Sequence, residues 1–193
     1  MKRSKIHLPM AALILAALAI PAAAQQQVPF HNPVTMMFSG DGGASAINLT
    51  LPNTRNGEEN LAGNGTLGPF TFRLVRATAT SSQPSSACSG VFFATMAGAG
   101  LFRFQDGSLL KAKVTGGGDC VDLVQGVGHC TLTFQIAGGT GRFEGASGDL
   151  TLIETALPVV DASGAPVFFT ETGECTGTVS GVAMEEESQD ARR

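Results

Sequence analysis

Apolar and polar residues alternate one by one along most of this chain, in short runs separated by glycines. In residues 130–136, for example, Leu132, Phe134 and Ile136 alternate with polar residues. Because successive side chains of a β-strand point to opposite faces, such a run is typical of a strand with one buried face and one wet face. After residue 24, no stretch repeats apolar residues at helical spacing for more than a turn or two. The chain is therefore predicted to be all-β.

The alternating runs fall at the spacing of β-hairpins. Asp-Gly within residues 105–108 supplies the positive φ that a two-residue turn needs. Residues 52–60 and 79–87 are predicted to be polar loops, because they are rich in residues that favour turns. Eight or nine strands are predicted, at residues 34–39, 46–51, 65–78, 90–95, 100–104, 109–115, 130–136, 146–155 and 167–182.

A closed, up-and-down antiparallel barrel of roughly eight strands satisfies this pattern and leaves no free strand edge. A two-sheet sandwich would alternate in the same way, so the pattern alone does not separate the two architectures. An outer-membrane barrel would also alternate, but it would carry interfacial girdles, usually of Tyr and Trp. The chain contains neither residue, which argues against that class.

The first 24 residues are typical of an export signal. A positively charged start is followed by an apolar run at residues 8–20 and by small residues at 21–24, where a signal peptidase would cleave. The apolar run is about a dozen residues long, whereas a membrane-spanning helix needs roughly 20, so a retained anchor is the weaker reading. We therefore expect a signal peptide over residues 1–24 and a secreted or periplasmic mature chain with no membrane span.

The rest of the chain is predicted to form a single domain. Residues 25–183 have a suitable length for one barrel, and the charged residues 184–193 are predicted to be a disordered tail. Removal of the leader leaves nine basic against sixteen acidic residues, a net charge of −7 with His neutral. Nucleic-acid binding needs clustered Lys and Arg, so no nucleic-acid partner is expected.

The four cysteines are Cys88, Cys120, Cys130 and Cys175. An even count in an exported protein predicts two disulfides, and four cysteines allow three connectivities. We expect Cys120–Cys130, which would close the loop between two strands, together with Cys88–Cys175. A zinc site is the weaker interpretation, because the cysteines are not spaced as Cys-x-x-Cys and only His129 lies nearby. Neither a metal nor a cofactor is expected.

The stretch AGGTGRFEGASGDLTL, residues 137–152, holds five glycines in sixteen residues. A dinucleotide-binding loop would have to open a helix in a βαβ unit, and a phosphate-binding loop would need Gly-Lys-Ser/Thr. Here an alternating strand follows instead. The stretch is therefore predicted to be a tight hairpin with glycines at left-handed positions. Phe143 would plug the barrel end, while Arg142 and Glu144 would face solvent or form pairs.

The same segment resembles a hairpin shared by dirigent proteins, allene oxide cyclases and many secreted bacterial proteins of unknown role. GNGTLGPFTFRL at residues 63–74 is similar to a strand opening of that bacterial group, and the DGS turn at residues 106–108 fits as well. The resemblance covers roughly residues 63–182. It implies an eight-stranded, calycin-like barrel with an interior pocket, often trimeric in the plant members. No catalytic residue is carried over, because dirigent and cyclase sites use pocket tyrosines and this chain has none.

Arg76 has the same parity as Phe72 and Leu74, so strict alternation points it into the barrel unless it lies past the rim. A buried arginine needs a carboxylate or a ligand anion. The phenylalanines of the alternating runs would either line an apolar pocket or fill it as core. The predicted ligand-binding residues are Arg76, Phe70, Phe72, Phe102, Phe104 and Phe134.

No residue is predicted to be catalytic. His31 and His129 stand in no recognisable triad pattern. Glu154, Glu171 and Glu174 would suit acid–base chemistry only if they faced inward at a suitable separation, and acidic residues on strands are expected to face water.

These observations favour an exported β-barrel that binds a small lipophilic molecule without catalysis. One alternative is a cyclase- or isomerase-like enzyme of the allene oxide cyclase or dirigent type, which would act mainly by confining a reactive substrate. Another is a structural or interaction domain that docks a partner through loops such as residues 53–60. Self-association into a homo-oligomer stays open.

Overall fold

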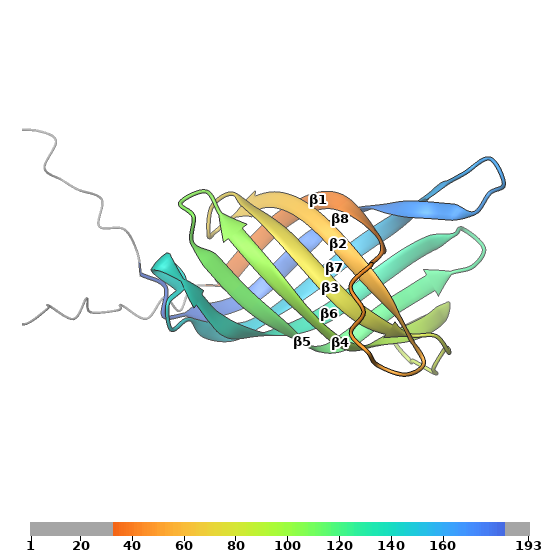
Figure 1. Cartoon of the computed structure of the whole chain (residues 1–193), viewed down its shortest axis with the longest axis horizontal. Helices are drawn as coiled ribbons and strands as arrows, with labels where there is room; N and C mark the ends of the chain where they lie inside the picture. Colours follow the sequence, from red (N-terminus) through yellow and green to blue (C-terminus); the bar gives the residue numbers. More distant parts are fainter. Residues whose placement is uncertain (1–32, 184–193) are drawn as a thin grey trace, which may run out of the picture.

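The computed structural model describes residues 33–183, which form one closed barrel of eight strands (Figure 1). The expected signal peptide at residues 1–24 and the expected tail at residues 184–193 lie outside the described residues. None of the described residues forms a helix long and apolar enough to cross a membrane. The elements are β1 (Pro33–Ala44), β2 (Thr54–Gly65), β3 (Phe70–Ala79), β4 (Val91–Phe104), β5 (Leu109–Asp122), β6 (Val127–Thr140), a 3₁₀ turn η1 (Gly141–Phe143), β7 (Ser147–Val160) and β8 (Pro166–Ser180).

The predicted up-and-down antiparallel barrel is confirmed. Each strand pairs with the next one in the chain, and β1 also pairs with β8, which closes the sheet on itself. Closure excludes the two-sheet sandwich. It also satisfies the backbone groups that an open sheet would expose at its edges.

The predictions for residues 46–51 and 52–60 are wrong. Residues 46–51 do not pair as a strand, and β2 occupies most of the segment that was expected to be a loop. Local interactions hold the irregular part: the amide of Thr50 donates to Asn48 Oδ1 at 2.7 Å, and Thr50 and Asn53 have φ of 56° and 58°. β2 forms despite its turn-rich composition because it pairs with β1 on one side and β3 on the other, and such pairing outweighs weak strand propensity.

One long strand, β4, replaces the two strands expected at residues 90–95 and 100–104. Its middle is a run of Ala and Gly, which was expected to separate two strands. A Cβ on Gly100, however, would collide with the ring of Phe72. The small residues therefore leave space for a core side chain and continue the strand.

Phenylalanines fill the barrel at the end that carries the β4–β5 and β6–β7 connections. The rings of Phe72 and Phe102 stack with centroids 4.1 Å apart, and Phe104 and Phe143 lie 4.7 Å apart. Phe143, on η1, is fully buried and closes this end, as expected. Burial of each such ring contributes about 1.5–3 kcal/mol to stability. We refer to this part of the molecule as the closed end.

The glycine-rich stretch is a hairpin connection, as predicted. Gly138 and Gly141 have φ of 81° and 59°, a left-handed conformation that glycine adopts without strain. The guanidinium of Arg142 pairs with Asp106 at 3.0 Å and lies 4.8 Å from the ring centroid of Phe104. This arginine ties the β6–β7 connection to the β4–β5 turn.

The predicted disulfides Cys120–Cys130 and Cys88–Cys175 are wrong. Among the described residues there is one bridge, Cys88–Cys120, with Cα atoms 5.5 Å apart, while Cys130 and Cys175 are free and buried. Asp119 faces the barrel interior, so the thiol of the next residue, Cys120, points outward. Cys130 is the partner of Asp119 on β6 and lines the same cavity, so its thiol points inward. Side chains on opposite faces of a sheet cannot form a disulfide. The observed bridge ties the β3–β4 connection to the outside of β5.

Candidate functional site

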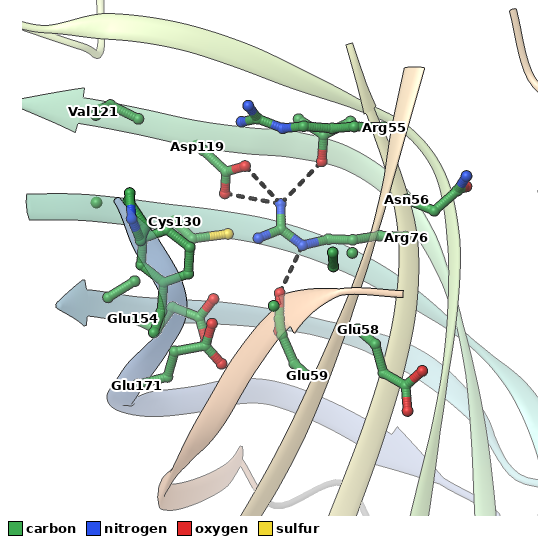
Figure 2. A pocket seen from close by; sticks show the side chains of 18 of the residues that line it. Arg55, Asn56, Glu58, Glu59, Arg76, Asp119, Val121, Cys130, Glu154 and Glu171 are labelled. Atoms are coloured by element: carbon green, nitrogen blue, oxygen red, sulfur yellow. Dashed lines mark hydrogen bonds and ion pairs between the residues drawn. The ribbon is translucent and has the colours of Figure 1, made fainter. Parts of the chain in front are cut away.

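A cavity of about 340 Å³ opens at the end of the barrel opposite Phe143. We call this part the open end. Figure 2 shows side chains that line this cavity. The wall near the mouth includes apolar side chains, among them Val121, Ala156, Val167 and Phe169. Deeper in the barrel lie the charged side chains of the cavity floor, which we call the charged layer: Glu59, Arg76, Asp119, Glu154 and Glu171.

The charged layer forms where the inward positions of several strands change from apolar to polar. Alternation keeps the parity, so a residue two positions further toward the open end also faces inward. In each strand, the change from apolar to polar can therefore be seen in the sequence as two residues of the same parity. The residue pairs are Leu61 and Glu59 on β2, Leu74 and Arg76 on β3, and Leu152 and Glu154 on β7.

Gly42 on β1 makes room for Glu171 on β8. The two strands are neighbours, and a Cβ added at residue 42 would collide with the carboxylate of Glu171. The missing side chain therefore lets the carboxyl of Glu171 lie inside the barrel, where the side chain is only 4% exposed.

Asp119 faces the cavity because β5 is irregular. The pairing of β5 with β6 shifts between Val114 and Gly116. Before the shift, Val114 and the other even-numbered residues face inward; after it, the odd-numbered residues Asp119 and Val121 line the cavity. A β-bulge changes the face to which the following side chains point.

Arg76 is the centre of the charged layer, and its side chain is 12% exposed. Its Nη1 donates to both oxygens of Asp119 at 2.8 Å, and its Nε donates to Glu59 Oε1 at 2.6 Å. Nη1 also reaches the hydroxyls of Thr78 and Thr95 at 3.3 and 3.5 Å. Burial opposes the charge of Arg76, but Glu59 and the other acidic groups outweigh it and hold its pKa well above the usual value.

Glu154 and Glu171 have no comparable partner. Among the described residues, no N–H or O–H group donates to either oxygen of Glu154 or to Oε2 of Glu171, and the only donor beside Glu154 is the weak thiol of Cys130. Burial, and then the charges of Glu59 and Glu171, raise the pKa of Glu154 to about 9, against a smaller opposing effect of Arg76 and Cys130. Burial and Glu59 raise the pKa of Glu171 to about 8. Both carboxyls therefore hold protons at neutral pH when nothing else neutralises them.

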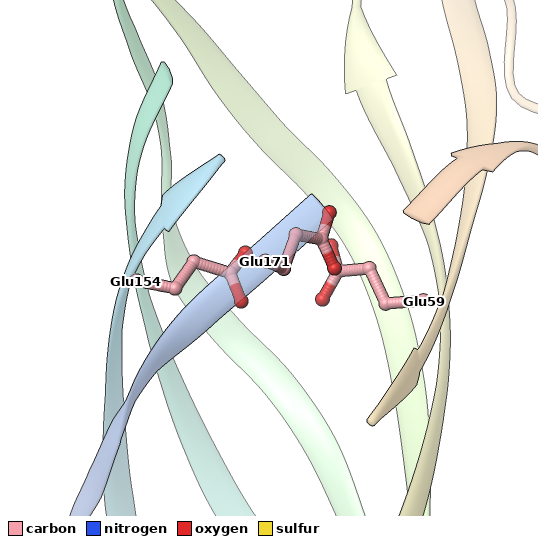
Figure 3. Close-up of side chains that lie close together, drawn as sticks. All are labelled: Glu59, Glu154 and Glu171. Atoms are coloured by element: carbon pink, nitrogen blue, oxygen red, sulfur yellow. The ribbon is translucent and has the colours of Figure 1, made fainter. Parts of the chain in front are cut away.

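Glu59 belongs to the same cluster (Figure 3). Burial raises its pKa although Arg76 opposes the shift, and its Oε2 has no partner within the described part of the chain. One oxygen from each of Glu59, Glu154 and Glu171 lies within 4.8 Å of the others. These three carboxyls are the residues of the site that could hold a metal ion.

The two free thiols are also buried. Burial raises the pKa of Cys130 well above its usual value, and Arg76 opposes this only in part. Burial raises the pKa of Cys175 to about 12. Because the thiolate is the nucleophile, neither residue is poised for nucleophilic chemistry at neutral pH.

The structure separates the residues predicted to bind a ligand. Arg76 faces inward, as its parity predicts, and lines the cavity. The predicted phenylalanines do not line this cavity but lie in the packed core: Phe70, Phe72, Phe102, Phe104 and Phe134.

Of the other candidates, Glu154 and Glu171 face inward, so the expectation that strand acids face water is wrong for both. Glu174 lies on the opposite face of β8 and does not line the cavity. His129 is exposed, and its Nδ1 lies 3.5 Å from Thr155 Oγ1. His31 lies outside the described residues.

Glu59 and Asp119 were missed. Glu59 falls in the segment predicted to be a loop, and Asp119 follows the bulge that reverses the parity of β5. A signal for Glu59 exists: residues 57, 59 and 61 keep the parity of a strand that ends at Gly65.

Comparison with known proteins found no relative. No protein-family model matches the chain, and neither a curated protein nor a solved structure is significantly similar to it. The likeness to dirigent proteins and allene oxide cyclases stays a prediction from the sequence. Function is therefore argued from the geometry of the open end.

Proposed function

We propose that the protein binds one small, mostly apolar molecule in the cavity of the open end, with an uncharged oxygen group of the ligand directed to the charged layer. The observation that carries this proposal is a cavity of about 340 Å³ that ends on the charged layer. Pockets of roughly 300–1,000 Å³ with apolar walls and a few convergent polar groups are typical of small-molecule sites.

The wall of the cavity supports an apolar ligand body. Val121, Ala156, Val167 and Phe169 converge from three strands toward the mouth. Val167 is 62% exposed, and contact of this apolar surface with water is unfavourable. A ligand in the cavity would remove this surface from water.

The chemistry of the floor supports an uncharged oxygen as the polar end. The protonated carboxyls of Glu154 and Glu171 can each donate one hydrogen bond to a hydroxyl or carbonyl oxygen. A ligand carboxylate at the floor would add a negative charge where the charge of Arg76 is already shared by Asp119 and Glu59. Arg55, the other arginine that lines the cavity, lies over the ring of Phe93 and outside the charged layer. The cavity therefore favours an alcohol or ketone over an acid of the same length.

Calorimetric titration with 1-hexanol and hexanoate in EDTA, where no metal ion neutralises the carboxyls of the charged layer, tests this proposal. We expect 1-hexanol to bind with a dissociation constant on the order of 1 mM or lower, as for a compact seven-atom ligand, and hexanoate to bind at least about tenfold more weakly. In Ala156→Phe the ring would occupy the cavity and abolish binding. Ile153→Phe is the matched control, because Ile153 lies on the outer face of β7 and is 48% exposed. Equal binding by both variants would refute the proposal.

A second candidate function rests on the position of Glu154, whose carboxyl lines the cavity, is buried without a hydrogen-bond partner among the described residues, and lies close to Glu59 and Glu171. A buried, protonated carboxyl beside other carboxyls is a suitable general acid, which could protonate a substrate oxygen and take a proton back in a cyclisation or isomerisation. This is the activity that the resemblance to allene oxide cyclases implies. Incubation with a medium-chain alkyl epoxide, followed by gas chromatography, tests it. Turnover by the wild type that Glu154→Gln loses would support catalysis, and identical product formation with and without protein would exclude it for this substrate class.

We also infer that the protein works outside the reducing cytoplasm. The disulfide Cys88–Cys120 supports this, because such bridges persist in oxidising compartments. The predicted leader supports it as well. Cell fractionation with N-terminal sequencing of the mature chain would test export, and light scattering after gel filtration would test self-association.

A further inference from the structure

Three buried carboxyls from three strands meet on the floor of the cavity. Glu59 comes from β2, Glu154 from β7 and Glu171 from β8 (Figure 3). They are between 2% and 4% exposed, and one oxygen of each lies within 4.8 Å of the others. The barrel, and not a flexible loop, fixes their separation.

The hydrogen bonds of these carboxyls are incomplete. Glu59 Oε2, both oxygens of Glu154 and Glu171 Oε2 are buried without a partner among residues 33–183. Buried polar atoms in folded proteins nearly always have a partner, and an exception calls for an explanation such as an ion. Each of these atoms belongs to a side chain that lines the cavity.

The positive charge within the site is too small to balance its acids. Arg76 is the only cation paired within the charged layer, and its bonds go to Asp119 and Glu59. Within the charged layer, one guanidinium against four carboxylates leaves three negative charges uncompensated when all are ionised. Arg55 and Glu58 also line the cavity, and they add one charge of each sign, so the balance is unchanged. A bound ammonium would neutralise one of these charges, whereas a divalent cation would neutralise two.

We propose that Glu59, Glu154 and Glu171 bind a calcium ion at the floor of the cavity. All-oxygen carboxylate sites suit hard cations such as Ca²⁺, Mg²⁺ and Mn²⁺. Because these oxygens lie within 4.8 Å of one another, one ion can lie no more than about 2.8 Å from all three, which accommodates the 2.3–2.6 Å that Ca²⁺ requires. Ca²⁺ is preferred to Mg²⁺ because Mg²⁺ demands near-ideal octahedral geometry, gives up its waters reluctantly and is seldom held by protein ligands alone. Three carboxyls leave some of the six to eight calcium positions for water or a ligand oxygen.

Calcium titration of the protein stripped with EDTA tests the site. We expect one Ca²⁺ per chain, an affinity in the millimolar range or tighter, and weaker binding of Mg²⁺. Glu154→Gln and Glu171→Gln should each weaken binding by at least about tenfold, because each removes one charged ligand. Glu174→Gln is the matched control on the outer face of β8, and it should bind like the wild type.

Urea unfolding provides a second measurement that does not depend on the heat of binding. Calcium should raise the unfolding midpoint of the wild type and of Glu174→Gln, but not that of Glu171→Gln, because a ligand stabilises only the state that binds it. No binding at about 10 mM Ca²⁺, above the range of extracellular calcium modules, would overturn the proposal. Equal binding by Glu171→Gln, or stronger stabilisation by methylammonium than by calcium, would also overturn it. No organic ligand is present in these experiments, so this site and the proposed small-molecule binding can fail independently.

Discussion

The protonated carboxyls of the open end predict that the barrel loses stability as pH rises through neutrality. In the cation-free protein the folded state holds protons on Glu154, with a pKa of about 9, and on Glu171, with a pKa of about 8. In the unfolded chain both titrate near 4.5. Between about pH 5.5 and 7.5 the folded state therefore binds more protons than the unfolded state, and stability falls with rising pH.

The expected size of this effect is large. Each carboxyl contributes about 1.4 kcal/mol per pH unit in this window, so the two together give about 2.7 kcal/mol per unit. Burial raises the pKa of Glu59 as well, which adds to the loss, whereas the charge of Arg76 lowers the pKa of both Glu154 and Glu171 and reduces it. A loss of about 3–5 kcal/mol between pH 5.5 and 7.5 is a substantial part of the 5–15 kcal/mol typical of a folded domain.

Glu154→Gln isolates one carboxyl without a change in shape. An amide does not titrate, so the variant should lose about half of the pH slope and should be roughly 2–4 kcal/mol more stable than the wild type at pH 7.5. Urea unfolding in EDTA, followed by far-ultraviolet circular dichroism because the chain has no Trp or Tyr, measures both quantities. Glu174→Gln should keep the wild-type slope. Stability that rises with pH, or a Glu154→Gln slope equal to that of the wild type, would refute the reasoning.

Three further predictions concern the rest of the barrel. Phe102→Ala should destabilise the protein by about 3–5 kcal/mol in urea unfolding, because it leaves a cavity in the closed end, and a loss below about 1 kcal/mol would contradict that packing. The double variant Cys88→Ser/Cys120→Ser should lose about 3–4 kcal/mol in the same assay, given the sequence separation of 32; an unchanged midpoint would count against the bridge. Cys130 and Cys175 should react with a thiol reagent only in denaturant, and rapid labelling of the native protein would show that they are not buried.

The sequence predicts the barrel because alternation is a local signal that survives in most strands. It fails at β2, where the residues that favour turns are also the residues that cover a wet outer face, and only pairing with β1 and β3 decides between the two. It also fails at the middle of β4. There the small residues around Gly100 give space to Phe72, a contact between strands that no local pattern contains.

The charged layer shows the same limit. The inward position of Arg76 follows from its parity with Leu74, and so does the need for a carboxylate partner. Its actual partners do not follow: Glu59 lies in the mispredicted segment, and Asp119 faces inward only because a bulge in β5 reverses the parity. The same reversal explains the wrong disulfide, since it turns Cys120 away from Cys130.

The central claim is that the closed end is filled with side chains and the open end receives a ligand. Nitrogen–proton correlation spectra recorded during a titration with 1-hexanol test it most directly. The account predicts saturable shifts of amides around the cavity, such as Gly57, Val121, Ala156 and Val167, with no change around Phe143. Shifts centred on the closed end, or spread evenly over the outer face of the barrel, would contradict it.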